Sequence, residues 1–191
     1  MLKLSVVVIG RNEGARLERC FQSLREMHPI DGGVEWIYVD SASTDQSVAY
    51  ARAQGAQVIE LRASRPSAAL ARNAGWRQAK GAFILFLDGD TILDPAFARK
   101  ALIAASPSMK IAAVWGHRRE LRPQANLFHR VLDLDWVYAA GETEFCGGDV
   151  LMRRSALERV NGFSESLIAG EEPELCSRLR ALDYSILHID E

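Results

Sequence analysis

The sequence is poor in cysteine. Its three cysteines, Cys20, Cys146 and Cys176, lie far apart in a chain of 191 residues and form neither a CxxC pair nor a disulfide framework. We therefore expect a protein of a reducing compartment. Cys146 and Cys176 are predicted to be small core residues rather than nucleophiles.

A long apolar run is also missing. The apolar run at residues 4–9 is far too short to cross a membrane, and no small-residue cleavage site of a signal peptide follows it. These absences predict a cytoplasmic protein, at most at the inner face of a membrane. Membrane association is expected only through segments that are missing from this chain.

Neither sign of charge is in large excess. Lysine and arginine total 23 against 25 acidic residues, so the formal net charge is -2. This balance offers no general electrostatic attraction to nucleic acid or to anionic lipid. We therefore do not expect nucleic acid as a partner. An anionic ligand must therefore be bound by a local group of residues.

Several catalytic signatures are absent as well. The sequence contains no GxGxxG after its first apolar run, no GxxxxGK[ST], no GxSxG and no HExxH. The four histidines show no metal-ligand spacing and are predicted to be surface or packing residues; they are His28, His117, His129 and His188.

Strand and helix patterns alternate through the first half of the chain. With 48% hydrophobic residues the chain can bury the core of a single globular domain. The alternation predicts an α/β fold with a mostly parallel central sheet flanked by helices, in which residues 82–87 form the central strand. The predicted strands are 4–9, 34–40, 57–61 and 82–87, and the predicted helices are 16–27, 43–53 and 67–79.

The second half is less regular and predicts mixed strands. We expect a strand that runs into a basic turn, a helix, a turn and strand, an acidic helix start and a final strand-like run. These segments are 113–121, 126–139, 145–152, 171–182 and 184–191.

Ligands of open α/β sheets bind at the carboxyl ends of the strands. This rule singles out residues 10–13, 40–45, 64–72 and 88–90. Within the last of these, Asp88 and Asp90 flank a glycine directly after the central strand, and their oxygens suit Mg²⁺ or Mn²⁺ together with diphosphate oxygens. The alternative is a solvated turn with an aspartate cap.

Three further groups carry possible chemistry. Asp40 ends a strand, where a carboxylate can accept hydrogen bonds from a base or ribose, whereas Asp45 is better placed to cap the next helix. The guanidinium of Arg72 suits phosphate oxygens, unless it is solvated on a helix face. The acidic run at residues 171–174 could supply a general base, or could only complement a helix dipole.

Taken together, six motifs strongly resemble those of family 2 glycosyltransferases of the GT-A fold, in matching order over nearly the whole chain. They are Val6-Val-Val-Ile-Gly-Arg-Asn-Glu13, Val39-Asp-Ser-Ala-Ser-Thr-Asp45, Ala71-Arg-Asn-Ala-Gly75, Phe86-Leu-Asp-Gly-Asp-Thr91, Cys146-Gly-Gly148, and Gly162-Phe-Ser-Glu165 with Gly170-Glu-Glu-Pro-Glu-Leu-Cys-Ser-Arg-Leu179.

The resemblance implies a role for each matching position. Asp88 and Asp90 would form the DxD metal motif, with Asp90 the more direct ligand, and Arg72 would lie near the diphosphate. Asp40 would hold the nucleotide base, typically uracil, and Glu172 would be the catalytic base. The remaining donor-binding positions would be Gly10, Arg11, Asn12, Glu13, Gly89, Gly147 and Gly148.

The implied organisation is one catalytic domain over residues 1–191. Residues 1–95 would form its nucleotide-binding half and residues 96–191 its acceptor-side half, truncated at the C-terminus. Two positions depart from the family pattern, because Glu172 stands where relatives carry aspartate and Ala42 where many carry glycine.

The implied reaction is inverting transfer of a sugar from a nucleoside-diphosphate donor, expected to be a UDP-sugar, to a hydroxyl of a sugar or lipid-linked acceptor, as in polysaccharide or glycolipid synthesis. Mg²⁺ or Mn²⁺ and a carboxylate base would assist it. Two rivals remain: a transferase-like domain that binds a nucleotide sugar or a partner without turnover, and a nucleotidyltransferase.

Overall fold

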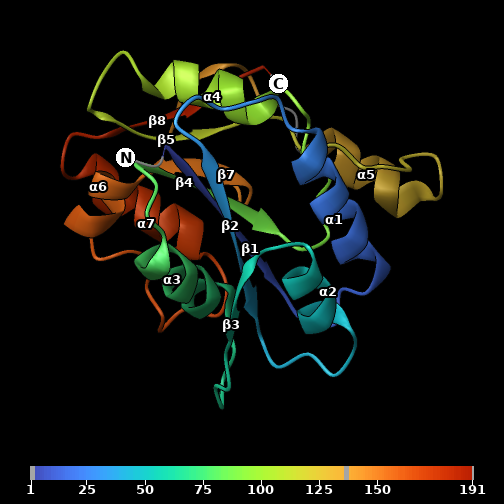
Figure 1. Ribbon diagram of the computed structural model, residues 1–191. Helices are drawn as coiled ribbons and strands as arrows, with labels where there is room; N and C mark the ends of the chain where they lie inside the picture. Colours follow the sequence, from blue (N-terminus) through green and yellow to red (C-terminus); the bar gives the residue numbers. More distant parts are fainter. Residues whose placement is uncertain (1–2, 136–137, 191) are drawn as a thin grey trace.

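The structure is a computed structural model that describes residues 3–135 and 138–190, and its strands form one eight-stranded sheet (Figure 1). The strand order across the sheet is β3-β2-β1-β4-β7-β5-β8-β6. The strands are β1 Leu4–Gly10, β2 Val34–Asp40, β3 Gln57–Glu60, β4 Phe83–Asp88, β5 Ile111–Trp115, β6 Gly141–Thr143, β7 Val150–Arg153 and β8 Ser185–His188.

Helices cover both faces of this sheet. Apolar residues of α1, α2 and α4 pack on one face and those of α3, α6 and α7 on the other, so the sheet lies between two helical layers. The helices are α1 Ala15–Glu26, α2 Ser47–Ala53, α3 Ala68–Gln78, α4 Phe97–Ala105, α5 Leu127–Asp135, α6 Arg154–Arg159 and α7 Glu171–Arg180. None of these helices is long and apolar enough to span a membrane.

The first half confirms the predicted alternation. β1 pairs in parallel with β2 and β4, and β2 pairs in parallel with β3. Every residue of β1 from Leu4 to Ile9 is buried, as is expected of a strand that is covered on both faces. β4 occupies the middle of the sheet, as predicted.

The second half contains the expected mixture of strand directions. β7 runs antiparallel to β4 and to β5, while β5 and β8 are parallel. Helices α4 and α6 and the short strand β6 were not predicted; α6 and β6 are short, whereas α4 has a helical apolar period that the sequence reasoning missed. The helix expected at 126–139 ends at Asp135, and residues 136–137 lie outside the described residues.

Two local features explain how the loops around the site are shaped. Ala42 has a φ of 61°, a left-handed conformation that favours glycine. Asp45 accepts a hydrogen bond from the backbone N–H of Ser47, the first residue of α2, at 2.9 Å, but the N-cap position itself is held by Gln46 rather than by the predicted Asp45.

Candidate active site

A cavity of about 460 Å³ opens at the carboxyl edge of β1 and β4. The two strands end side by side, with Ile9 opposite Asp88, and Gly89 donates its N–H to the Ile9 carbonyl at 2.8 Å. A Cβ added at Gly10 or Gly89 would lie within 3.0 Å of the Glu13 side chain, so glycine is needed at both turns.

Half of the predicted site positions line this cavity. The lining positions are Gly10, Arg11, Glu13, Asp88, Gly89 and Asp90, and the cavity is completed by residues that include Ser41, Ser67 and Arg118. The other predicted positions are not part of this lining; they are Asn12, Asp40, Arg72, Gly147, Gly148 and Glu172.

Asp40 is almost fully buried at the end of β2. Its carboxylate accepts hydrogen bonds from the Tyr38 hydroxyl at 3.1 Å and from the Ser43 backbone at 2.8 Å. The side chain of Asn12 accepts from the Thr44 N–H at 2.7 Å, which ties the loop after β1 to the loop after β2. Local donors therefore hold both predicted residues in fixed positions.

Arg72 lies at the centre of a buried ionic cluster. Its Nη2 donates to Asp88 Oδ1 at 3.1 Å, while its Nη1 lies 2.8 Å from Glu171 Oε1 and 2.8 Å from Glu172 Oε1. The residue is only 2% exposed, so the alternative of a solvated arginine on a helix face is wrong. One guanidinium thus joins the predicted metal motif to the predicted base.

Glu172 stands at the start of α7, where Pro173 is tolerated because the first turn needs no backbone donor. Burial raises the pKa of Glu172 above its ordinary value; the Arg72 guanidinium opposes this shift, and Glu171 adds to it. Glu171 is more deeply buried than Glu172. A carboxylate with a raised pKa beside a cavity has the properties of a general base.

The turn before β7 meets the Asp88 turn because β7 is antiparallel to β4. Val150 pairs with Phe86, so the residues that precede β7 lie at the edge where β4 ends. A Cβ at Gly148 would lie 2.5 Å from Arg72 Nη2 and 3.3 Å from Glu172 Oε1, whereas one at Gly147 would meet nothing closer than Trp115 at 3.9 Å. The backbone at Gly148 therefore lies directly on the ionic cluster.

Asp149 is a site residue that the sequence reasoning missed. Its Oδ1 accepts from the Asp88 backbone N–H at 3.0 Å, and its two oxygens accept from the Thr91 hydroxyl at 3.0 and 2.9 Å. Burial, and then the charge of Asp88, raises the pKa of Asp149 to about 6. The sequence feature that could have indicated Asp149 is its position directly between the glycine pair 147–148 and the apolar run that follows.

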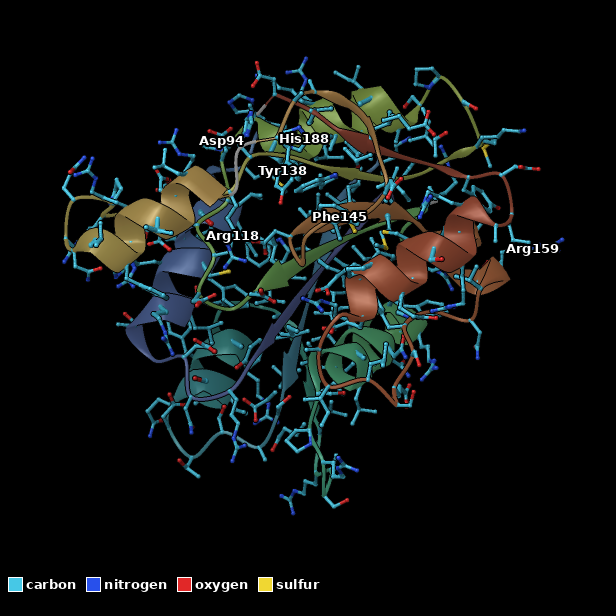
Figure 2. The ribbon with its side chains drawn as sticks, turned by 180° about the vertical axis from the view of Figure 1, so that it is seen from behind. Asp94, Arg118, Tyr138, Phe145, Arg159 and His188 are labelled. Atoms are coloured by element: carbon cyan, nitrogen blue, oxygen red, sulfur yellow. The ribbon has the colours of Figure 1, made fainter. Side chains whose placement is uncertain are left out.

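Arg118 was also missed as an individual site residue, although the basic turn that contains it was predicted. β5 is antiparallel to β7, with Trp115 opposite Val150, so the chain leaves β5 at the same edge as the Asp88 turn. Arg118 lines the cavity, and its Nε lies 4.0 Å from Asp149 Oδ2 (Figure 2).

The acidic groups at this edge suit a divalent cation that is also bound by a diphosphate. Arg72 offers one positive charge to three carboxylates, so the cluster keeps an excess of negative charge. Within residues 3–135 and 138–190 no three acidic, histidine or cysteine side chains are gathered as a complete metal site. Asp88 and Asp90, which both line the cavity, could therefore hold Mg²⁺ or Mn²⁺ only with ligand oxygens.

Cys146, Cys176 and His188 have packing positions, as predicted, and Cys20 is buried as well. All three cysteines are buried and free, and the sulfur atoms of Cys146 and Cys176 are 3.5 Å apart. His188 is 1% exposed, and its ring lies 4.6 Å from that of Trp115.

A mostly parallel sheet between two helical layers, with acidic turns and a cavity at the carboxyl edge, defines the GT-A class of fold. The model of the family described as "Glycosyl transferase family 2" matches residues 5–160, and the chain belongs to this family.

Three solved structures illustrate the likeness in fold. TarS 1–349 of S. aureus gives a TM-score of 0.78 at 18% identity and covers 100% of this chain and 58% of that one. The mannosyltransferase PcManGT of Pyrobaculum calidifontis, solved with GDP-Man and Mn²⁺, gives 0.78 at 22% identity and covers 99% and 55%. Glucosyl-3-phosphoglycerate synthase of Mycobacterium tuberculosis, solved with UDP, gives 0.69 at 24% identity and covers 98% and 70%.

The chain thus spans little more than half the length of the first two of these structures. No curated protein sequence matches it.

Proposed function

We propose that the chain is an inverting glycosyltransferase that moves a sugar from a nucleoside-diphosphate donor to a hydroxyl acceptor, with a UDP-sugar as the expected donor. Membership of the family supports transfer of a sugar. The similar structures were solved with UDP, UDP-GlcNAc or GDP-Man, which supports a nucleotide-linked donor.

One observation carries the proposal. A single buried guanidinium, that of Arg72, lies within 3.1 Å of Asp88, which lines the cavity, and within 2.8 Å of Glu172. The carboxylate predicted to bind the donor and the carboxylate predicted to accept a proton therefore share one guanidinium, and each would have a separate role. Direct displacement needs the base and the diphosphate site within one sugar's reach of each other and on opposite faces of the anomeric carbon, since the acceptor oxygen attacks opposite the departing diphosphate.

Residues 1–95 would bind the donor. The turn from Gly10 to Glu13 would border the nucleoside, and Asp40 would orient the base through the loop that carries Ser41. Asp88 and Asp90 would hold Mg²⁺ or Mn²⁺, whose charge would stabilise the departing nucleoside diphosphate. Arg72 would then act beside the diphosphate mainly by orienting Asp88.

Residues 96–191 would bind the acceptor. Gly148 would leave room for the sugar and the acceptor, because it presents no side chain beside the cluster, and Gly147 would border the same space from the preceding position. Glu172 would take the proton of the acceptor hydroxyl as that oxygen attacks the anomeric carbon, and no covalent intermediate would form.

Nucleotide binding with and without Mn²⁺ tests the donor site. In calorimetry and thermal-shift titrations with UDP, GDP, dTDP and CDP, UDP should stabilise the chain only with Mn²⁺, by about 2.7 kcal/mol at a hundredfold excess over Kd. Asp90→Ala should lose this effect, whereas Asp31→Ala, which removes an exposed carboxylate outside the cavity, should keep it.

Three outcomes would contradict parts of the proposal. Failure to bind any nucleotide would reject the donor site, and equal UDP binding by Asp90→Ala without Mn²⁺ would reject the metal role. Tight binding of a UDP-sugar without transfer or hydrolysis would favour the domain that binds without turnover.

A further inference from the structure

Helix α5 is amphipathic, and two of its polar side chains, His129 and Asp133, bond to the loop that precedes it. Asp133 accepts hydrogen bonds from the guanidinium of Arg119 at 2.8 Å and from the backbone of Glu120 at 2.9 Å. His129 Nδ1 lies 2.9 Å from Glu120 Oε2. These polar contacts join the helix to the loop that precedes it.

The opposite side of α5 exposes large apolar side chains. Leu127, Phe128, Val131 and Leu134 are 76%, 69%, 55% and 72% exposed, and their spacing puts them on one side of the helix. Leu121, in the preceding loop, is 67% exposed. We call these five residues the α5 apolar face. Large apolar side chains exposed in number over one short segment favour an interaction surface.

Two arginines accompany this face. Arg122 and Arg130 are exposed, and no residue in 3–135 or 138–190 forms an ion pair with either of them. The nearby carboxylates of Glu120 and Asp133 are turned toward His129 and Arg119. The face therefore combines apolar side chains with positive charge.

We propose that the α5 apolar face docks on an anionic membrane surface, with the apolar side chains in the headgroup region and the two arginines at acidic headgroups. A surface with exposed apolar side chains and neighbouring arginines binds in this way, because apolar insertion and charge attraction add together. A second copy of the chain is a poorer occupant, since a stable protein interface takes about 20–30 residues a side, far more than these five apolar residues and two arginines.

The α5 apolar face is carried by a helix on the same side of the molecule as Arg118, which lines the cavity (Figure 2). Arg118, in the loop between β5 and α5, lines the donor cavity, and α5 lies at the periphery of the molecule beyond it (Figure 2). A membrane against α5 would lie near the rim of the cavity. The docking does not depend on the proposed reaction, and a lipid assay tests it separately.

Vesicle flotation of the whole chain tests the proposal. The chain should bind vesicles of phosphatidylcholine with phosphatidylglycerol, and less well those of phosphatidylcholine alone. Leu127→Ser with Phe128→Ser should weaken binding more than about tenfold. Arg122→Gln with Arg130→Gln should weaken it roughly thirtyfold, and added salt should also weaken it.

The controls separate docking from folding. Ile103→Ser replaces an apolar residue of α4 that is 63% exposed and should bind like the wild type. All variants should unfold at the wild-type temperature, because the replaced side chains are exposed. Absence of binding to anionic vesicles would overturn the proposal, and so would self-association that Leu127→Ser with Phe128→Ser abolishes.

Discussion

The two halves of the sheet bring residues to the candidate site by different routes. In β1, β2 and β4 the predicted donor residues follow the carboxyl ends of parallel strands. In the other half the predicted site residues lie before the antiparallel strand β7 and at the start of α7. The first route is a general property of parallel sheets, whereas the second depends on which strands happen to be neighbours.

Ionic and polar groups join the two halves at the site itself. Arg72 of the first half contacts Glu171 and Glu172 of the second, and Asp149 of the second half accepts from Asp88 of the first. Substitutions of these contacting residues should therefore affect both halves of the sheet. Substitutions of residues in one half should separate donor binding from sugar transfer.

The change with the largest expected effect separates donor binding from transfer. Glu172→Gln should lower kcat about 10²–10⁴-fold, because the acceptor proton loses its base, and should leave UDP binding with Mn²⁺ intact. Wild-type activity should fall as the pH drops through a pKa above the ordinary value for glutamate. Steady-state kinetics over pH and calorimetry measure these effects.

Glu174→Gln is the matched control on the same helix. Its carboxylate bonds to Arg178 instead of the cluster, so transfer should stay near the wild-type rate. Full activity of Glu172→Gln would remove Glu172 from the mechanism.

Arg72→Met should remove the ion pairs that connect the two halves of the sheet at the site. It leaves three carboxylates without their shared positive charge, and we expect the free energy of unfolding to fall by about 3–5 kcal/mol in urea titrations. Arg77→Met, on the same helix but in an exposed pair with Glu165, should cost less than about 1 kcal/mol. Equal losses for the two variants would contradict the special position of Arg72.

Asp149→Asn should change how stability depends on pH in metal-free protein. The folded-state pKa of Asp149 is raised from 3.8 to about 6, so the folded state binds this proton more tightly than the unfolded state. Its contribution is fully present below about pH 4 and is lost as the pH rises through about 6, by up to about 3 kcal/mol.

The amide side chain of this variant does not titrate, so the variant should gain stability relative to the wild type as the pH rises over this range. Urea titrations of both proteins with EDTA at several pH values measure the difference. A constant difference across the range would show that Asp149 titrates normally.

Gly148→Ala tests the close approach of the two halves. Its methyl group must displace the Arg72 guanidinium, and we expect a loss of about 1–3 kcal/mol together with slower transfer. Gly147→Ala has room for its methyl group and should change stability by less than about 0.5 kcal/mol. Thermal unfolding compares the stability of the two variants. A larger loss of stability for Gly147→Ala would contradict the close contact of Gly148 with Arg72.

The smallest effect concerns one loop of the first half. Ala42→Gly should stabilise the chain by about 0.5–1 kcal/mol, because the left-handed φ of 61° no longer strains a side chain. Ala104→Gly, inside α4, should instead destabilise it by about 1 kcal/mol. Calorimetry measures the unfolding of both variants. A loss of stability in both would contradict the backbone strain at Ala42.

Local sequence patterns were enough to predict the architecture of the first half and much of the cavity. Periodic apolar segments predicted β1, β2, β3 and β4 to within one or two residues. The carboxyl-edge rule then selected Gly10, Glu13, Asp88 and Asp90, which line the cavity. This was possible because strand period, turn composition and parallel crossovers are local or nearly local properties of a chain.

The meeting of distant parts of the chain, in contrast, is a property of the folded molecule alone. Arg72 and Glu171 are 99 residues apart in sequence, and Asp88 and Asp149 are 61 apart. No local pattern records that β7 inserts between β4 and β5. Such contacts depend on the order of strands across the sheet, which is selected by the packing of the whole core rather than by any one segment.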